Sequence, residues 1–218
     1  MAKRVLLCCL ALAVLPALAD DRQVELPSVL YTTFKQPPAA GVLHALEDEV
    51  ESIMGPLGRH FMWRPVSGVH GNEVSAELAV LTFTGRCDVA GMSAREGHPG
   101  ALGWTHVSDG VILPFSEIDC DRIRVFVQRQ LLYYPTSERE ATFGRAIARV
   151  VAHELYHIFA NTTHHGSDGV GKAAYTVEEL LSDEFDFERR EGEALRHTVW
   201  SGTGQPATIT PKTASPSF

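Results

Sequence analysis

The stretch 150-VVAHELYHIFANTTHHG-166 decides how this 218-residue chain is interpreted, because it joins an apolar helical pattern to four of the chain's ten histidines. His153 and His157 are four residues apart and flank Glu154. On an α-helix, residues at that spacing lie on one face, one turn apart, so both imidazoles can reach one metal ion at about 2.0–2.1 Å. The stretch therefore predicts a helix that carries a metal site.

Glu154 lies one residue round the helix from the first histidine, where it can accept a proton from a metal-activated water molecule. Zinc lowers the pKa of such a water to near 7, so the general base needs little driving force. The pattern H-E-x-x-H fixes only three positions and also occurs by chance, but here it lies deep inside a well-patterned helix. We therefore expect a Zn²⁺ site with His153 and His157 as ligands and Glu154 as the general base.

A catalytic zinc ion usually has three protein ligands and one open position, so a third ligand is expected. The segment resembles the metzincin group of zinc peptidases, whose longer motif is H-E-x-x-H-x-x-G-x-x-H. Ala160 stands at the glycine position of that motif, Thr163 stands at its third histidine position, and no methionine follows for the Met-turn of the group. The segment also resembles short secreted bacterial zincin-like sequences in which a histidine follows the second motif histidine by eight residues. That resemblance implies His165 as the third ligand, in preference to His164.

Asn161 is expected to end the motif helix, because asparagine adopts the left-handed conformation nearly as readily as glycine. Two alternatives for the third ligand stay open. One is His164, and the other is Glu179, which with Asp183 resembles the gluzincin pattern of a ligating glutamate followed four residues later by an aspartate. Glu179 has a second explanation, since it can form a capping box with Thr176 at the start of a helix.

The first nineteen residues have the layout of a secretory signal peptide, with a basic start, an apolar run over 5–15 and an Ala-Leu-Ala cleavage site ending at Ala19. About eleven apolar residues are too few to span a membrane. We therefore expect cleavage near Ala19 and a secreted or periplasmic protein. One domain is expected over 20–200, followed by a flexible C-terminal tail over 201–218.

Cleavage would remove Lys3 and Arg4 from the 19 basic residues and none of the 27 acidic ones, which leaves a formal net charge of −10. An acidic surface argues against a nucleic-acid partner, because phosphate binding needs clusters of Lys and Arg. No later stretch is long and apolar enough to span a bilayer. The cysteines that remain are Cys87 and Cys120, and an oxidising compartment favours a disulfide between them over two buried free thiols. We expect a monomer whose partner is a peptide or protein substrate.

Apolar periodicity predicts helices and strands in an α+β arrangement. We expect helices over 39–57, 121–132, 137–160 and from 177 to at least 187, strands over 61–66, 73–85, 102–107 and 111–119, and irregular chain over 20–38 and 85–101. The apolar positions that alternate in the second strand are Val74, Ala76, Leu78 and Val80. Asp109-Gly110 predicts a hairpin between the last two strands, and Pro114 predicts an edge or a bulge.

Two capping boxes are predicted, Ser137 with Glu140 and Thr176 with Glu179. The elements together predict a single α+β domain, zincin-like by resemblance, in which a mixed sheet is packed against helices and one helix carries HELYH. Zincin peptidases hold substrate as an extra strand on a sheet edge, and the resemblance makes 102-LGWTHV-107 the candidate edge.

The function expected from these features is that of a secreted zinc metallopeptidase, an endopeptidase that hydrolyses peptide bonds through a zinc-activated water with Glu154 as general base. One alternative is a zincin-like protein that binds a partner without turning it over, although such a protein has no need of Glu154. The other alternative is a zinc hydrolase that acts on a substrate other than a peptide.

Overall fold

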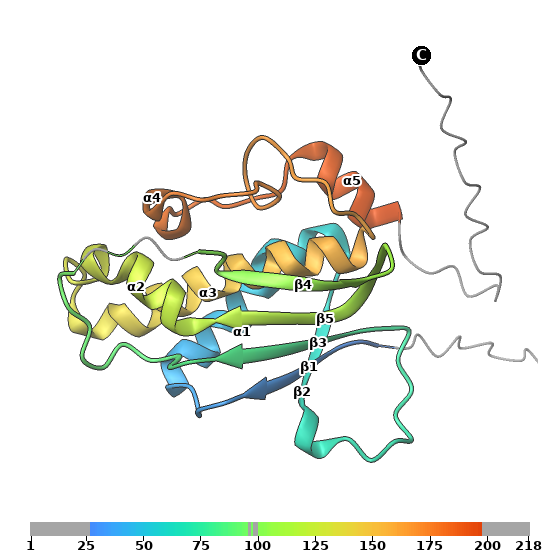
Figure 1. Ribbon diagram of the computed structural model, residues 1–218, viewed down its shortest axis with the longest axis horizontal. Helices are drawn as coiled ribbons and strands as arrows, with labels where there is room; N and C mark the ends of the chain where they lie inside the picture. Colours follow the sequence, from blue (N-terminus) through green and yellow to red (C-terminus); the bar gives the residue numbers. More distant parts are fainter. Residues whose placement is uncertain (1–26, 96, 98–99, 198–218) are drawn as a thin grey trace, which may run out of the picture.

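The computed structural model describes residues 27–95, 97 and 100–197 (Figure 1). Its strands are β1 (Ser28–Phe34), β2 (Phe61–Pro65), β3 (Glu77–Thr84), β4 (Gly103–Ser108) and β5 (Val111–Asp119). Its α-helices are α1 (Ala40–Met54), α2 (Cys120–Leu131), α3 (Thr136–Phe159), α4 (Val177–Leu181) and α5 (Arg189–His197), with 3₁₀ turns at Gly55–Leu57 and Val66–Gly68. The predicted signal peptide and C-terminal tail lie outside the described residues. None of the helices in the described part is both long enough and apolar enough to cross a membrane.

The strands form one mixed sheet in the order β2-β1-β3-β5-β4, in which only β4 runs antiparallel to its neighbour. A two-residue turn makes that reversal, because Asp109 and Gly110 both have positive φ values, of 50° and 78°. The predicted hairpin is thus confirmed, and it leaves β4 at the edge of the sheet. Pro114, which predicts an edge or a bulge, lies where the pairing of β5 is interrupted: β5 pairs with β3 only from Phe115 onwards, and the β4–β5 register shifts between Thr105 and Val107.

The core lies between one face of the sheet and helices α1 and α3, which Figure 1 shows together on that side. The sheet side chains in this core include Leu30, Ala79, Leu81, Phe83 and Ile118. Helices α1 and α3 approach closely at Gly144, where a Cβ atom would lie 2.5 Å from the carbonyl oxygen of Val42. The predicted α+β class is confirmed, and α3 is the central buried element that carries HELYH.

Two predictions about the strands were wrong. Residues 28–34 form β1 rather than irregular chain, because this segment pairs in parallel with both β2 and β3, and such non-local pairing leaves little local signal. In β3 the fully buried positions are Ala79 and Leu81, together with Phe83, while Leu78 is 39% exposed. Apolar residues occupy both faces of β3, so alternation alone did not identify the face that meets the helices.

Two predictions about helix ends were also wrong. Helix α3 begins at Thr136 without a side-chain cap, so Ser137 and Glu140 form no capping box; the carbonyl of Pro135 accepts the first-turn hydrogen bond from the Glu138 amide at 2.9 Å. Helix α4 ends at Leu181 and does not reach Phe187.

Arg149 explains the early end of α4. Its guanidinium projects from α3 and donates to the carbonyls of Glu179 and Leu180 at 3.1 and 3.0 Å, so these groups need no amide from a further helical turn. The Ser182 hydroxyl donates to the Glu179 carbonyl as well, at 2.9 Å. A tertiary contact from a distant helix has therefore replaced the next turn of α4.

A disulfide joins Cys87, in the segment after β3, to Cys120, the first residue of α2. The predicted pairing is thus confirmed. Both half-cystines are buried, at 2% and 0% exposure. The bond ties the irregular chain before β4 to the start of a core helix.

The close approach at Gly144 generates a stability prediction. Gly144→Ala should lower the free energy of unfolding by about 1–2 kcal/mol, because the clash with the α1 backbone outweighs the gain in helix propensity. Urea unfolding followed by circular dichroism measures this change. The matched control is Gly68→Ala, whose new methyl group would meet only Pro65 Cγ, at 3.7 Å. Equal stability of the two variants would contradict the packing argument.

Candidate metal centre

Helix α3 places His153, Glu154 and His157 in its last turns and then ends in a left-handed cap. Asn161 has a φ of 47°, and its amide donates to the Ile158 carbonyl at 3.2 Å. The next amide, that of Thr162, donates to the His157 carbonyl at 3.1 Å. These two bonds define a Schellman motif, which reverses the chain and satisfies the terminal carbonyls. The predicted role of Asn161 is confirmed, and the reversal returns the following histidines towards the helix.

Three imidazoles converge at this reversal. Ligand nitrogens of His153, His157 and His165 all lie within 4.8 Å of one another. The His165 ring centroid lies 5.2 Å from that of His153 and 4.9 Å from that of His157. The two helical histidines are buried and His165 is exposed, so the cluster opens to solvent on one side. Within residues 27–95, 97 and 100–197, this is the group of three side chains arranged to hold a metal ion.

The tautomers of the two helical histidines follow from their backbone contacts. His153 Nδ1 lies 2.8 Å from the Val170 carbonyl, and His157 Nδ1 lies 2.7 Å from the Thr162 carbonyl. A carbonyl can only accept, so each Nδ1 carries the proton and each Nε2 presents a lone pair. The two Nε2 atoms are 3.1 Å apart. Two lone pairs cannot form a hydrogen bond with each other, whereas a cation between them would be stabilised by both.

The geometry fits zinc. Two nitrogens that each bind a tetrahedral zinc ion at about 2.0–2.1 Å lie about 3.3 Å apart, close to the separation of the two Nε2 atoms. Burial lowers the pKa of His153 to about 4, and it lowers the pKa of His157 as well. Both rings are therefore neutral at physiological pH, which is the form that binds metals.

Glu154 lies buried beside the histidines, and a residue of the sheet forms a hydrogen bond with its carboxylate. The Thr105 hydroxyl on β4 donates to Glu154 Oε2 at 2.7 Å. Burial raises the pKa of Glu154 to about 7, against the opposing effect of the Thr105 hydrogen bond. A cation on the histidines would oppose the rise, because a nearby positive charge favours the carboxylate. A carboxylate with its proton affinity tuned close to neutrality is suited to general base catalysis.

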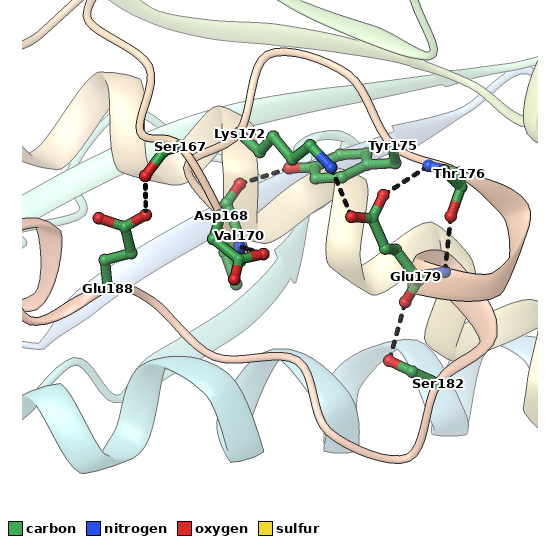
Figure 2. A network of polar contacts seen from close by, with 10 residues as sticks. Ser167, Asp168, Val170, Lys172, Tyr175, Thr176, Glu179, Ser182 and Glu188 are labelled. Carbon is green, nitrogen blue, oxygen red and sulfur yellow. Dashed lines mark hydrogen bonds and ion pairs between the residues drawn. The ribbon is translucent and has the colours of Figure 1, made fainter.

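Tyr175 contacts His153 at Nδ1, the ring nitrogen that does not face the other histidines. The Tyr175 hydroxyl donates to the Val170 carbonyl (Figure 2). The same hydroxyl lies 2.9 Å from His153 Nδ1, so the three groups share one hydrogen-bonded cluster. Partners of this kind fix the tautomer and the ring orientation of a ligating histidine. The sequence carries no sign of this role, because Tyr175 is 22 positions away from His153 and meets it only through the fold.

Glu179 and His164 do not belong to the histidine cluster. Glu179 accepts from the Thr176 amide at 2.6 Å, while its own amide donates to the Thr176 hydroxyl at 3.2 Å, so the predicted capping box is present. Lys172 pairs with the same carboxylate (Figure 2). His164 is exposed, and its amide donates to the Thr162 hydroxyl at 3.1 Å. Of the three candidates for a third ligand, the structure brings His165 alone to the two helical histidines.

A cleft of about 670 Å³ contains the histidines and Glu154. Residues of β4, of the segment 173–175 and of α3 line it. Figure 1 shows α4 and α5, with the chain that connects them to α3, beyond β4 on the side away from the rest of the sheet. Apart from the site residues the lining is largely apolar and includes Leu102, Trp104, Ile112, Phe126 and Val150.

Comparison with known proteins adds little to this geometry. No family model matches the sequence, and no curated protein matches it. Among solved structures, the chain is similar to an archaemetzincin from Methanopyrus kandleri, with a TM-score of 0.48 and 13% identity over 81% of this chain and 97% of that one. At that TM-score and identity the likeness carries no argument about function. The three converging imidazoles themselves indicate a metal centre.

The cluster predicts a ranking of zinc affinities. His165→Ala should weaken zinc binding by about 100-fold or more, because it removes a ligand, and even outer-shell changes cost about 10–100-fold. His164→Ala and Glu179→Gln should bind zinc nearly as well as the unaltered protein. Competition with a chromogenic chelator measures all three affinities. A large loss in Glu179→Gln with none in His165→Ala would show that the third ligand is the glutamate.

Tyr175 predicts a smaller effect on the same measurement. Tyr175→Phe keeps the ring and removes the hydroxyl from His153 and Val170, so zinc affinity should fall by about 10-fold. Tyr31→Phe is the control, since it removes a hydroxyl from another buried tyrosine, on β1 away from the cleft. If the two variants bind zinc equally well, the hydroxyl does not position His153.

Proposed function

We propose that this chain is a secreted zinc metallopeptidase, with His153, His157 and His165 as the zinc ligands and Glu154 as the general base. The observation that carries the proposal is the convergence of three imidazoles beside a buried carboxylate in an open cleft. Zinc held by the three imidazoles would polarise a scissile carbonyl and lower the pKa of a water molecule. A pure metal-storage site has no use for a carboxylate at the position of Glu154, which disfavours an inactive binding protein.

The sheet edge supports a peptide as the substrate. Strand β4 has β5 on one side only, and its other side borders the cleft. The backbone of an extended peptide can hydrogen-bond to such an edge as an added strand. This would lay the peptide along the cleft, next to Glu154. A chain bound at internal residues can enter and leave such an open cleft, which favours an endopeptidase over an exopeptidase, and the free strand edge favours a peptide over another substrate.

The chain's own residues would then move one proton through the reaction. Glu154 accepts a proton from the attacking water as the water oxygen bonds to the scissile carbonyl carbon. When the C–N bond breaks, Glu154 delivers that proton to the departing nitrogen, which leaves as an amine. The carboxylate of Glu154 is thereby restored, and the products are one new carboxyl end and one new amino end.

Export and a monomeric state belong to the same proposal. The layout of residues 1–19 supports a secreted or periplasmic protein. The Cys87–Cys120 disulfide is consistent with it, because such bonds persist in oxidising compartments. The acidic composition disfavours nucleic acid as a partner. The partner would be an unstructured peptide or protein.

Glu154→Gln tests the function. The variant should bind zinc as the unaltered protein does but cleave an unfolded protein such as casein about 10²–10⁴-fold more slowly, because it loses the base and keeps every ligand. Mass-spectrometric mapping of the products measures cleavage, and a chelator should abolish it in the unaltered protein. Zinc-loaded protein that cleaves neither casein nor a peptide library would contradict the proposal, as would full activity in Glu154→Gln.

A further inference from the structure

We propose that Thr105 and Ser116 form a chain of two hydroxyls that positions the Glu154 carboxylate and leaves Oε1 as its single proton-accepting oxygen. This inference rests on the proposed peptidase function and adds two positioning residues to it. Ser116 is buried behind Thr105, and Thr105 lines the cleft next to Glu154. Both would act through Glu154.

The three groups are linked in series from the core to the cleft. Ser116 lies on β5, directly opposite Thr105 on β4, and is 2% exposed. The two hydroxyl oxygens are 2.8 Å apart, and Thr105 Oγ1 lies 2.7 Å from Glu154 Oε2. A chain of hydrogen bonds thus runs from a buried serine on β5, through Thr105 on the edge strand, to the carboxylate on α3.

The direction of the chain follows from the number of protons. An ionised carboxylate only accepts, so the single hydroxyl proton of Thr105 goes to Glu154. Thr105 can then act only as an acceptor towards Ser116, which must donate. Ser116 thereby occupies a lone pair of Thr105 and keeps the Thr105 proton directed at Glu154. Hydrogen bonds in series polarise one another, so the bond to the carboxylate is strengthened.

The local backbone brings this pair to the helix. At Gly103, two residues before Thr105, a Cβ atom would lie 3.1 Å from Glu154 Oε1 and 2.9 Å from Val150 Cγ1. Strand β4 therefore packs directly on these two side chains of α3, and a larger residue at position 103 would have to displace them. Immediately after Thr105 the register with β5 shifts, and pairing resumes at Val107, opposite Ile112. Shifts of this kind re-aim side chains next to functional sites.

The two carboxylate oxygens would therefore have different roles in catalysis. Oε2 is engaged by the donated proton of Thr105, which makes it the poorer acceptor for a second proton. The proton taken from water therefore goes to Oε1. Without the Thr105 hydroxyl, the carboxylate would be free to rotate about its terminal torsion, and the two oxygens could exchange places.

The test compares Thr105→Val, which has the same shape without a hydroxyl, with Thr105→Ser, which keeps the hydroxyl. On an internally quenched peptide derived from a mapped casein cleavage site, Thr105→Val should lower kcat by about 10–100-fold, since it removes one hydrogen bond to a charged group. KM and zinc content should stay within about twofold, because β4 keeps its backbone and α3 its ligands. Thr105→Ser should recover most of kcat, and Ser116→Ala should give a smaller loss than Thr105→Val.

Two further measurements separate positioning from a structural effect. Thr82→Val is the matched control, because Thr82 lies on β3 and points to the sheet face opposite that of Leu81, away from α3. Crystal structures of the Thr105 variants should show the Glu154 carboxylate rotated in the valine variant and in place in the serine variant.

The outcomes are distinguishable. Unchanged kcat in Thr105→Val overturns the inference, and so does an equal loss in the valine and serine variants, which would indicate a packing role. A rise in KM without a fall in kcat would point to strand β4 rather than to Glu154 and would also overturn it. If the unaltered protein cleaves no peptide, the proposed function itself fails, and that failure appears before any variant is measured.

Discussion

Two backbone carbonyls determine what the histidines of this protein can do. The Thr162 and Val170 carbonyls each accept the Nδ1 proton of one helical histidine, which turns two Nε2 lone pairs towards each other at 3.1 Å. That arrangement is unfavourable unless a cation lies between the rings. The burial that depresses the pKa values of both histidines also prevents them from relieving the repulsion by protonation. The site is therefore organised for a metal ion before any ion binds.

Much of the chain after α3 serves to hold those carbonyls in place. The Schellman motif at Asn161 presents the Thr162 carbonyl, and Tyr175 steadies that of Val170. The buried side chain of Glu191 lies against two glycines of the loop after α3. A Cβ atom on Gly166 would lie 2.0 Å from Glu191 Oε1, and one on Gly171 would lie 1.9 Å from the same oxygen. Those glycines permit the loop to close around helix α5. The Val170 amide donates to the Asp186 carbonyl at 3.0 Å and fixes the same loop from its other side.

Sequence patterns predicted the parts of this site that are local. The i, i+4 histidines, the left-handed Asn161 and the Thr176–Glu179 capping box all depend on residues within one or two helical turns. The preference for His165 over His164 depended on the resemblance to zincin-like sequences, because the side chains of two adjacent residues can reach nearly the same position. Thr105 and Tyr175 had no signal at all, since each meets its partner across 49 or 22 positions of sequence. The same limit applies to β1, which the sequence predicted as irregular chain, and to α4, which it predicted to be too long. Pairing with distant strands determines β1, and Arg149 determines where α4 ends.

The edge position of β4 connects these local and distant elements. An unpaired strand edge is a liability, because its free amides and carbonyls invite pairing with other chains. Here residues of β4, residues of the segment 173–175 and the histidines line one cleft, so a strand added at this edge would lie beside the histidines. The strand that would bind an extended peptide is also the strand whose threonine holds Glu154. If the proposed function holds, a displacement of β4 would move the bound peptide and, through the Thr105 hydrogen bond, the Glu154 carboxylate as well.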